Sequence, residues 1–242
     1  MRFISLAGYK FVPLERLPEL KAGLKECCGE LGLKGTILVS PEGINIFVSG
    51  FGLAVTRFKA FVHADSRLAG LRFKESVSSY QPFKHMLVKI KKEIITLRVP
   101  GLNPAAQRAP SVTPAELKRW LDEGRDVVLL DTRNAFEVET GTFRDAVHLN
   151  LKSFGEFPRA ADKLDKSLKG KTVVTFCTGG IRCEKAAPVL IQKGFRSVFQ
   201  LEGGILQYFE DCGDAHFTGR CFVFDQRTAL DGNLNPELAG AE

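Results

Sequence analysis

The sequence has 242 residues, of which 44% are hydrophobic and 26% charged, so it has the composition of a folded globular protein and not of a disordered chain. No apolar run approaches the roughly 20 residues of a membrane helix, and the first residues lack the apolar segment of a secretion signal, so we expect a cytoplasmic protein with no membrane partner. The net charge of +6 is uneven: residues 1–100 contain 16 Lys and Arg against 8 acidic residues, whereas residues 101–242 contain 18 against 20, which indicates a polyanionic partner for the first part.

Residues 1–99 are predicted to form a small basic domain. The expected elements are strands at 3–12, 35–40, 43–49 and near 85–97, and helices at 17–31 and 52–64. The residues Pro41, Glu42 and Gly43 predict a hairpin turn between the two middle strands. This order of elements is the ferredoxin-like pattern, in which two helices cover one face of an antiparallel sheet and leave the other face free for a partner.

A linker and a second domain are predicted to follow. Residues 100–112 contain three prolines and no apolar periodicity, which is typical of a linker. Thr113, Pro114 and Glu116 form a capping box that opens a helix, and Gly124 is expected to end it. The later elements are strands at 126–131, 172–176 and 197–201 and helices at about 155–168, 182–193 and 204–211. Short, continuously apolar strands favour a parallel α/β domain, here residues 113–212, followed by a strand segment and tail at 213–242.

The six cysteines are expected to be reduced thiols, because no secretion signal precedes them. Cys27 and Cys28 are adjacent in a stretch whose apolar residues recur at helical spacing, so at least one of them is predicted to be a core residue. No two cysteines have CxxC spacing, and the chain has four histidines. We therefore predict no metal and no bound cofactor.

The most informative stretch is the loop 177–182, with the sequence CTGGIR, between a predicted strand and a predicted helix. Ligands of parallel sheets bind beyond the carboxyl ends of the strands, where this loop would lie. Backbone N–H groups, a helix N-terminus and the Arg182 cation all favour an ionised thiol, so Cys177 is predicted to be a nucleophile. The alternative is a buried cysteine beside a glycine turn. The supporting loop residues are Thr178, Gly179, Gly180 and Ile181.

This strand, the Cys-x4-Arg loop and the helix resemble a rhodanese domain over roughly residues 112–212, together with the preceding segment that begins DTRNAFEVETG. The resemblance implies that Cys177 carries a persulfide and that Asp131 and Arg133 help to organise the site. Thr142 stands where many rhodaneses have histidine. This departure is expected to affect only local packing.

Six motifs across both predicted domains are similar to the bacterial oxygen-dependent tRNA uridine hydroxylases, which are rhodanese-domain proteins. The motifs are PEGIN (41–45), VKIKKEIITL (88–97), DTRN (131–134), FCTGGIRCEKA (176–186), LEGGILQYFE (201–210) and CFVFDQR (221–227). The resemblance spans almost the whole chain. It implies that the wobble uridine in the anticodon loop of tRNA is converted to 5-hydroxyuridine, with molecular oxygen as co-substrate and the loop cysteine as the reactive group.

Three other functions use a similar loop. A sulfurtransferase would move sulfane sulfur through a Cys177 persulfide, but it would not need the basic first domain. A rhodanese-like binding module without activity would not need both Cys177 and Arg182. Cysteine-based phosphatases typically have five residues between cysteine and arginine, and this loop has four.

Residues that would hold RNA are predicted near the end of the first domain. Lys84, Lys89, Lys91, Lys92 and Arg98 surround the single acidic residue Glu93. This density predicts phosphate contacts, and the alternative is an edge strand that lysines protect from aggregation. Candidates for stacking on an unpaired base are Tyr80, Phe83, Phe154 and Phe157, for each of which core packing is the alternative.

Two points of chemistry stay open in the sequence. Cys183 is predicted either to be a second catalytic thiol that resolves an oxidised Cys177 or to face the sheet from the first turn of a helix. Cys177 itself either adds to carbon 6 of uracil or first takes up oxygen or sulfur. The residues predict neither an oligomeric state, nor the source of electrons, nor which tRNAs are substrates.

Overall fold

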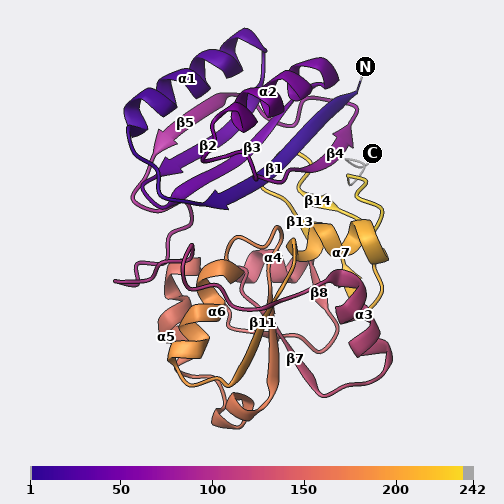
Figure 1. The fold of residues 1–242 in the computed structure, drawn as a ribbon. Coiled ribbons are helices and arrows are strands. Elements are labelled where there is room, and N and C mark those ends of the chain that lie inside the picture. The colour runs from indigo at the N-terminus through magenta and orange to yellow at the C-terminus, as the bar shows by residue number, and fades with distance from the viewer. Residues whose placement is uncertain (1, 237–242) are drawn as a thin grey trace. The chain divides into compact units, whose positions relative to one another are not determined.

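A computed structural model of the protein describes residues 2–236, which form two compact units divided between Thr96 and Leu97 (Figure 1). Each unit combines helices with its own β-sheet and its own hydrophobic core. Within the described residues, no helix has both the length and the apolar character that crossing a membrane requires.

The first unit is a five-stranded sheet with both of its helices on one face (Figure 1). Its elements are β1 (Phe3–Phe11), α1 (Leu17–Glu30), β2 (Lys34–Ser40), β3 (Gly43–Phe51), α2 (Gly52–Ala64), β4 (Lys74–Ser78) and β5 (Met86–Ile90). The strands lie in the order β4-β1-β3-β2-β5, and only β2 and β5 pair in parallel. The order β4-β1-β3-β2 confirms the ferredoxin-like prediction, and the hairpin between β2 and β3 forms at the predicted turn.

The last strand of the ferredoxin-like order is not the one expected from the sequence. Its position is occupied by β4, which pairs with β1, whereas β5 is an additional strand at the opposite edge. The sequence KESVS of β4 has no apolar alternation, and its only valine, Val77, is 45% exposed. This segment is therefore a strand because its backbone pairs with β1, and the pattern of its side chains does not predict a strand.

The core of the first unit lies between the sheet and its two helices. Alternate residues of β2 and β3, among them Ile37, Ile46 and Val48, form one buried cluster with Phe58 of α2. Cys28 of α1 is fully buried in this cluster and Cys27 packs against it. The prediction that at least one of these cysteines is a core residue is confirmed.

The second unit is a parallel sheet with the strand order β6-β11-β10-β7-β9. Its first elements are β6 (Ser111–Val112), α3 (Pro114–Asp122), β7 (Val127–Asp131), α4 (Ala135–Thr140), β8 (Gly141–Phe143) and β9 (Val147–His148). They are followed by η1 (Phe154–Glu156), α5 (Phe157–Ala161), η2 (Lys166–Gly170), β10 (Thr172–Phe176), α6 (Cys183–Gln192), β11 (Ser197–Leu201), α7 (Gly204–Cys212), β12 (Phe217–Gly219), β13 (Cys221–Phe222) and β14 (Ala229–Leu230). The predicted parallel α/β fold is confirmed.

Several local predictions for this unit can be compared with the structure. The Thr113 side chain accepts a hydrogen bond from the Glu116 N–H at 3.2 Å, as the capping box predicts. The continuous helix expected at about 155–168 is wrong, because this segment divides into η1, α5 and the start of η2. Pro158 in the first turn of α5 has no N–H to donate to the preceding turn, so the helix cannot extend backwards through it.

Parts of the expected linker and of the expected C-terminal segment form strands in the second unit. The last two residues of the 100–112 segment form β6, which pairs with β11. Within the 213–242 segment, β12 pairs with β8, and β13 and β14 form a hairpin. Residues 237–242 lie outside the described residues.

Strands β7 and β10 position the candidate site, because they lie side by side and end together. Phe176, the last residue of β10, is in register with Asp131, the last residue of β7. The Thr132 N–H and hydroxyl both donate to the carbonyl oxygen of Phe176, at 3.0 and 2.9 Å. The loops that follow the two strands therefore begin from one fixed point at the carboxyl edge of the sheet.

Candidate active site

The cysteine loop connects β10 to α6 and forms a tight turn around the Cys177 sulfur. The Gly180 N–H donates to Cys177 Sγ at 3.1 Å, and the Cys183 N–H donates to the Gly180 carbonyl at the start of α6. Gly180 has a φ of +96°, which favours glycine. Gly179 does not have a positive φ, and a Cβ at this position would meet nothing within 4 Å. Of the two adjacent glycines, only Gly180 is required by backbone geometry.

The environment of Cys177 favours the thiolate although the residue is only 1% exposed. Burial by itself raises the pKa of this thiol. A hydrogen bond from Cys183, the positive charge of Arg182 and backbone N–H groups of Arg182 and Gly180 outweigh burial and lower the pKa to about 6. A thiolate at neutral pH has the properties that nucleophilic catalysis requires.

The ionisation of Cys177 should be visible as a separate step in a pH titration. Burial raises the pKa of the other five cysteines, so they stay neutral where Cys177 loses its proton. We expect thiolate absorbance at 240 nm to rise with pH around a midpoint near 6, and activity to fall as pH drops below that value. The Cys177→Ser variant, as the control, should lack the step. A first thiolate midpoint above about 8, near that of an ordinary cysteine, would contradict the assignment.

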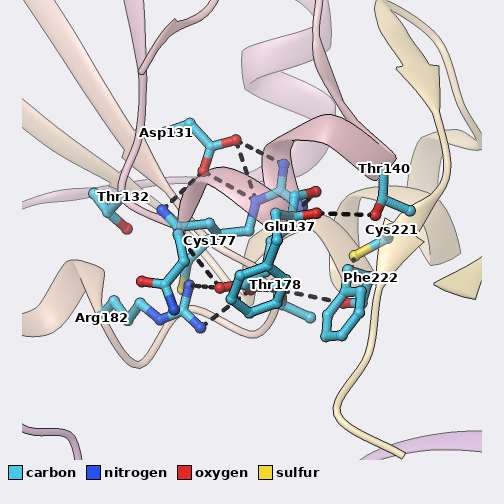
Figure 2. Close-up of polar contacts among 12 residues, drawn as sticks. Asp131, Thr132, Glu137, Thr140, Cys177, Thr178, Arg182, Cys221 and Phe222 are labelled. Atoms are coloured by element: carbon cyan, nitrogen blue, oxygen red, sulfur yellow. Dashed lines mark hydrogen bonds and ion pairs between the residues drawn. The ribbon is translucent and has the colours of Figure 1, made fainter. Parts of the chain in front are cut away.

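Arg182, the N-cap residue of α6, is held by a carboxylate that the sequence analysis did not identify. Its guanidinium nitrogens lie 2.8 and 3.1 Å from the two carboxylate oxygens of Glu137, whose side chain is fully buried (Figure 2). The backbone N–H of Asn134 also donates to Glu137, at 3.1 Å. Asn134 and Glu137 have the N-cap-x-x-Glu spacing that opens a helix, and this spacing was the only sequence signal for Glu137.

Asp131 and Arg133 form a second ion pair, which is fully buried behind the first. Arg133 Nε and Nη2 donate to the two Asp131 oxygens at 3.0 and 2.6 Å, and Arg133 also donates to the backbone carbonyls of Glu137 and Gly141. The Thr142 hydroxyl donates to Asp131 at 2.8 Å, so this residue extends the hydrogen-bond network in addition to its packing. The pair therefore supports helix α4, which carries Glu137, and does not contact the Cys177 sulfur itself.

Helix α7 holds the cysteine loop from its other side. The N–H groups of Ile205 and Leu206 donate to the carbonyls of Cys177 and Thr178 at 2.9 and 3.0 Å. Gly204 has a φ of +66°, and a Cβ on it would lie 2.3 Å from the Cys177 carbonyl oxygen. Only glycine permits this approach. The LEGGI sequence therefore contributes to the geometry of the loop, a role that its pattern alone did not indicate.

Cys183 lies fully buried in the first turn of α6, close enough to Cys177 to hydrogen-bond with it. Burial and the neighbouring Cys177 raise the pKa of Cys183, so it stays a neutral thiol that can donate a hydrogen bond. Its sulfur also lies 3.9 Å from the Thr132 hydroxyl. The structure thus brings the two cysteines together, and Cys183 is buried at the site as the packing alternative requires.

The other predicted site residues are placed as follows. Thr178 is partly buried, with its hydroxyl 3.5 Å from Glu137 and 3.4 Å from the Phe222 carbonyl, and Ile181 is buried. All five residues of the predicted RNA-binding set are exposed. Arg98 belongs to the second unit, and the first unit contains Lys84, Lys89, Lys91 and Lys92. Lys89 lies on the edge strand β5, so the alternative that these lysines protect an edge strand from aggregation is also consistent with the structure.

Two of the four predicted stacking residues are core residues. Phe154 is 5% exposed and Phe157 is fully buried, so neither can receive a base. Tyr80 is 40% exposed and Phe83 is partly buried. Within the described residues, no group of three or more His, Cys, Asp or Glu side chains is arranged to bind a metal ion.

Family models match both units of the chain. Residues 3–94 match the UPF0176 acylphosphatase-like domain and residues 113–211 match the rhodanese-like domain. Among solved structures, the rhodanese-like domain of the Anabaena protein Alr3790 is 21% identical, with a TM-score of 0.39, and the match covers 46% of this chain and 80% of that one.

Curated relatives extend over nearly the whole chain. The tRNA uridine(34) hydroxylase of Cupriavidus necator is 55% identical, and the match covers 98% of this chain and 86% of the relative. The tRNA uridine(34) hydroxylase of Ralstonia nicotianae is 52% identical with the same coverage. With this identity over both units, the chain belongs to the tRNA uridine(34) hydroxylase family.

Proposed function

We propose that this protein hydroxylates the wobble uridine, at position 34 of the tRNA anticodon loop, to 5-hydroxyuridine, with molecular oxygen as co-substrate. The observation that carries the proposal is the match to tRNA uridine(34) hydroxylases over both units, in a chain whose loop donates the Gly180 N–H to the Cys177 sulfur at 3.1 Å. The matching relatives span the basic first unit as well as the rhodanese domain, and a sulfurtransferase acting on small molecules has no use for that unit. Because tRNA is the substrate, the reaction takes place in the cytoplasm.

The test is mass spectrometry of tRNA nucleosides from aerated cells with and without the gene. Loss of 5-hydroxyuridine and its derivatives on deletion, and their return when the gene is restored, is the expected result. The Cys177→Ser gene serves as the matched control and should not restore them. Unchanged 5-hydroxyuridine in deleted cells that have no second pathway would reject the proposal.

The reaction requires two electrons in addition to oxygen. One oxygen atom of O2 enters at carbon 5 of uracil and the other leaves as water, which consumes two electrons and two protons. Two thiols that close to a disulfide release the same number of each. We propose Cys177 and Cys183 as this pair, because they are hydrogen-bonded, with a thiol reductant from outside the protein reopening the disulfide.

The Cys183→Ser variant tests this second thiol. Without Cys183, Cys177 can still supply both electrons once by taking the second oxygen atom as a sulfenic acid, which serine cannot resolve to a disulfide. We therefore expect one turnover at nearly the wild-type rate, followed by a loss of at least about tenfold in steady-state turnover. Comparing the rate of a single-turnover assay with that of a multiple-turnover assay measures this loss. Serine is slightly smaller than cysteine and adds no volume at this fully buried position, so the fold should be retained. Full multiple turnover would remove Cys183 from the mechanism and leave it a packing residue.

The exposed lysines of the first unit are proposed to hold the tRNA backbone. We expect the triple change of Lys89, Lys91 and Lys92 to glutamine to weaken tRNA binding and to lower the slope of log affinity against log salt by roughly one for each phosphate that a lysine no longer neutralises. Filter binding or fluorescence anisotropy at several salt concentrations measures this slope. Lys163→Gln with Lys166→Gln, which removes two exposed lysines of the second unit, is the control. An unchanged slope would assign the three lysines to protection of the edge strand instead.

A further inference from the structure

Three phenylalanines form a cluster beside the cysteine loop that the chemistry above does not use. Phe136 belongs to α4 and directly precedes Glu137, while Phe222 and Phe224 lie at the end of β13 and just after it. The ring of Phe222 lies 5.1 Å from each of the other two, and all three rings are nearly perpendicular to one another, at 81–89°. We call these residues the aromatic cluster.

The outer members of the aromatic cluster are exposed although the residues around them are buried. Phe136 is 44% exposed and Phe224 is 54% exposed, whereas Cys221 and Val223 are buried. Single exposed apolar side chains are common on protein surfaces. Two exposed aromatic rings in one cluster, beside a nucleophile, are instead typical of a ligand site.

The backbone holds Phe224 in this exposed position. The Val223 N–H donates to the Thr228 carbonyl at 2.8 Å, and the Thr228 N–H donates to the Asp225 carbonyl at 3.1 Å. Asp225 forms an ion pair with Arg227, and both side chains are only 5% exposed. These interactions fix the backbone of the hairpin, so the segment does not depend on burial of the Phe224 ring and the ring stays exposed to solvent. A ring that is already in place binds a partner with little loss of conformational entropy.

The aromatic cluster is connected to the catalytic loop through Arg182. The guanidinium carbon lies 5.7 Å from the centre of the Phe224 ring, and Arg182 is the last residue of the loop that begins at Cys177. The same guanidinium is held by Glu137, so its position beside the Phe224 ring is fixed. Exposed aromatic rings are the groups on which unpaired nucleobases stack, and the cation beside them can contribute to that contact.

We propose that Phe136 and Phe224 form the platform that receives the target uracil after it leaves the base stack of the anticodon loop. Because the two rings are perpendicular, the base faces one ring and meets the other at its edge. The inference rests on the proposed function and adds the residues that hold the base. Phe136 adjoins Glu137 and Phe224 contacts Arg182, so a base on these rings lies at the loop of Cys177. Stacking on the rings replaces the contacts that the base gives up when it is extruded.

The first experiment measures the affinity of the full-length protein for an anticodon stem-loop RNA. Phe136→Leu and Phe224→Leu keep apolar side chains but remove the rings, and each should weaken binding roughly 10-fold to 100-fold. Phe224→Tyr, which keeps the ring, should stay within about 2-fold. The control is Ile191→Ala, which truncates another exposed apolar residue of the second unit, 47% exposed on α6, and should change nothing.

A second arm identifies the base. RNA that lacks the base at position 34 should bind the wild-type protein at least as weakly as intact RNA binds Phe224→Leu. With this RNA, Phe224→Leu should bind as the wild-type protein does. For RNA that lacks the base at position 36 instead, Phe224→Leu should weaken binding by the same factor as it does for intact RNA. Thiolate absorbance of Cys177 should be unchanged in Phe136→Leu, since the ring that contacts Arg182 is that of Phe224.

The outcomes separate this proposal from the proposed function. If the wild-type protein binds and hydroxylates the RNA but the two leucine variants bind it normally, the platform is wrong and the proposed function stands. The platform is also wrong if Phe224→Leu weakens intact RNA and RNA without base 34 by the same factor. If the wild-type protein neither binds nor hydroxylates tRNA, both proposals are overturned.

Discussion

Replacing Cys177 with serine is expected to reduce tRNA hydroxylation to below about one-thousandth of the wild-type rate, a loss typical of a removed nucleophile. The pKa of Cys177 is lowered to about 6, so the wild-type residue is an anion at neutral pH, whereas a serine hydroxyl keeps its proton in the same place. Because Cys177 is only 1% exposed, tRNA affinity should change little. The measurement is the amount of 5-hydroxyuridine formed in a single turnover, which mass spectrometry quantifies.

The matched control for this variant is Cys212→Ser. Cys212 lies at the end of α7, is partly buried and has a raised pKa, so it is a thiol of the same unit without the features of the loop. It should retain activity within about twofold. If Cys177→Ser kept more than a tenth of the wild-type rate, the ionised cysteine would not be the reactive group.

The role of Cys177 divides into two chemical routes that one substrate analogue separates. If its thiolate adds to carbon 6 of uracil, carbon 5 becomes electron-rich and can react with oxygen. With 5-fluorouridine at position 34, breakdown of that adduct should stall, and the protein–tRNA complex should survive denaturation. Cys177→Ala should form none. Normal binding of the analogue without such a complex would favour the route in which Cys177 first takes up oxygen or sulfur.

Replacing Gly204 with alanine is expected to lower the melting temperature by roughly 10 °C, which corresponds to a destabilisation of about 3 kcal/mol or more. The residue has a φ of +66°, and the new Cβ would lie 2.3 Å from the Cys177 carbonyl and 2.7 Å from the Gly180 nitrogen. Both neighbours are backbone atoms of the cysteine loop and cannot rotate away. The loop must therefore move, which should also raise the pKa of Cys177 by lengthening its hydrogen bond from Gly180.

Gly179→Ala is the matched control for Gly204→Ala. Gly179 lies inside the cysteine loop, yet it lacks a positive φ, and a Cβ on it would meet nothing within 4 Å. Its melting temperature and the 240 nm titration of Cys177 should match those of the wild type. Differential scanning calorimetry gives the first and absorbance the second. Equal melting temperatures for the two alanine variants would show that contact with α7 does not define the loop.

Glu137 illustrates how the tertiary structure changes the meaning of a predicted residue. The sequence indicates Arg182 as a cation beside the cysteine, and the structure shows this cation held by a buried carboxylate. Removing one member of a buried ion pair leaves the other charge uncompensated. Glu137 is therefore a positioning residue for Arg182, in the same way that Asp131 and Arg133 support the helix that carries Glu137.

The sequence by itself determined the features that depend on neighbouring residues. The cysteine loop is six consecutive residues between an apolar strand and a helix, and the Thr113 capping box spans four. The order of helices and strands from β1 to α2 in the first unit and the parallel sheet of the second also followed from local periodicity. Each of these depends on interactions within about one turn or one strand, so the pattern of residue types contains the information.

Only the tertiary structure decided which distant residues meet. Arg182 and Glu137 are 45 positions apart, the Thr178 hydroxyl and the Phe222 carbonyl are 44 apart, and Gly204 approaches Cys177 from the start of another helix. The strand β4 exists because β1 offers it hydrogen bonds, and the exposed rings of Phe136 and Phe224 come together from separate segments. Such contacts depend on how strands align and helices pack. A sequence pattern describes the preference of a segment for helix or strand, whereas the complete fold determines the neighbours that each side chain receives.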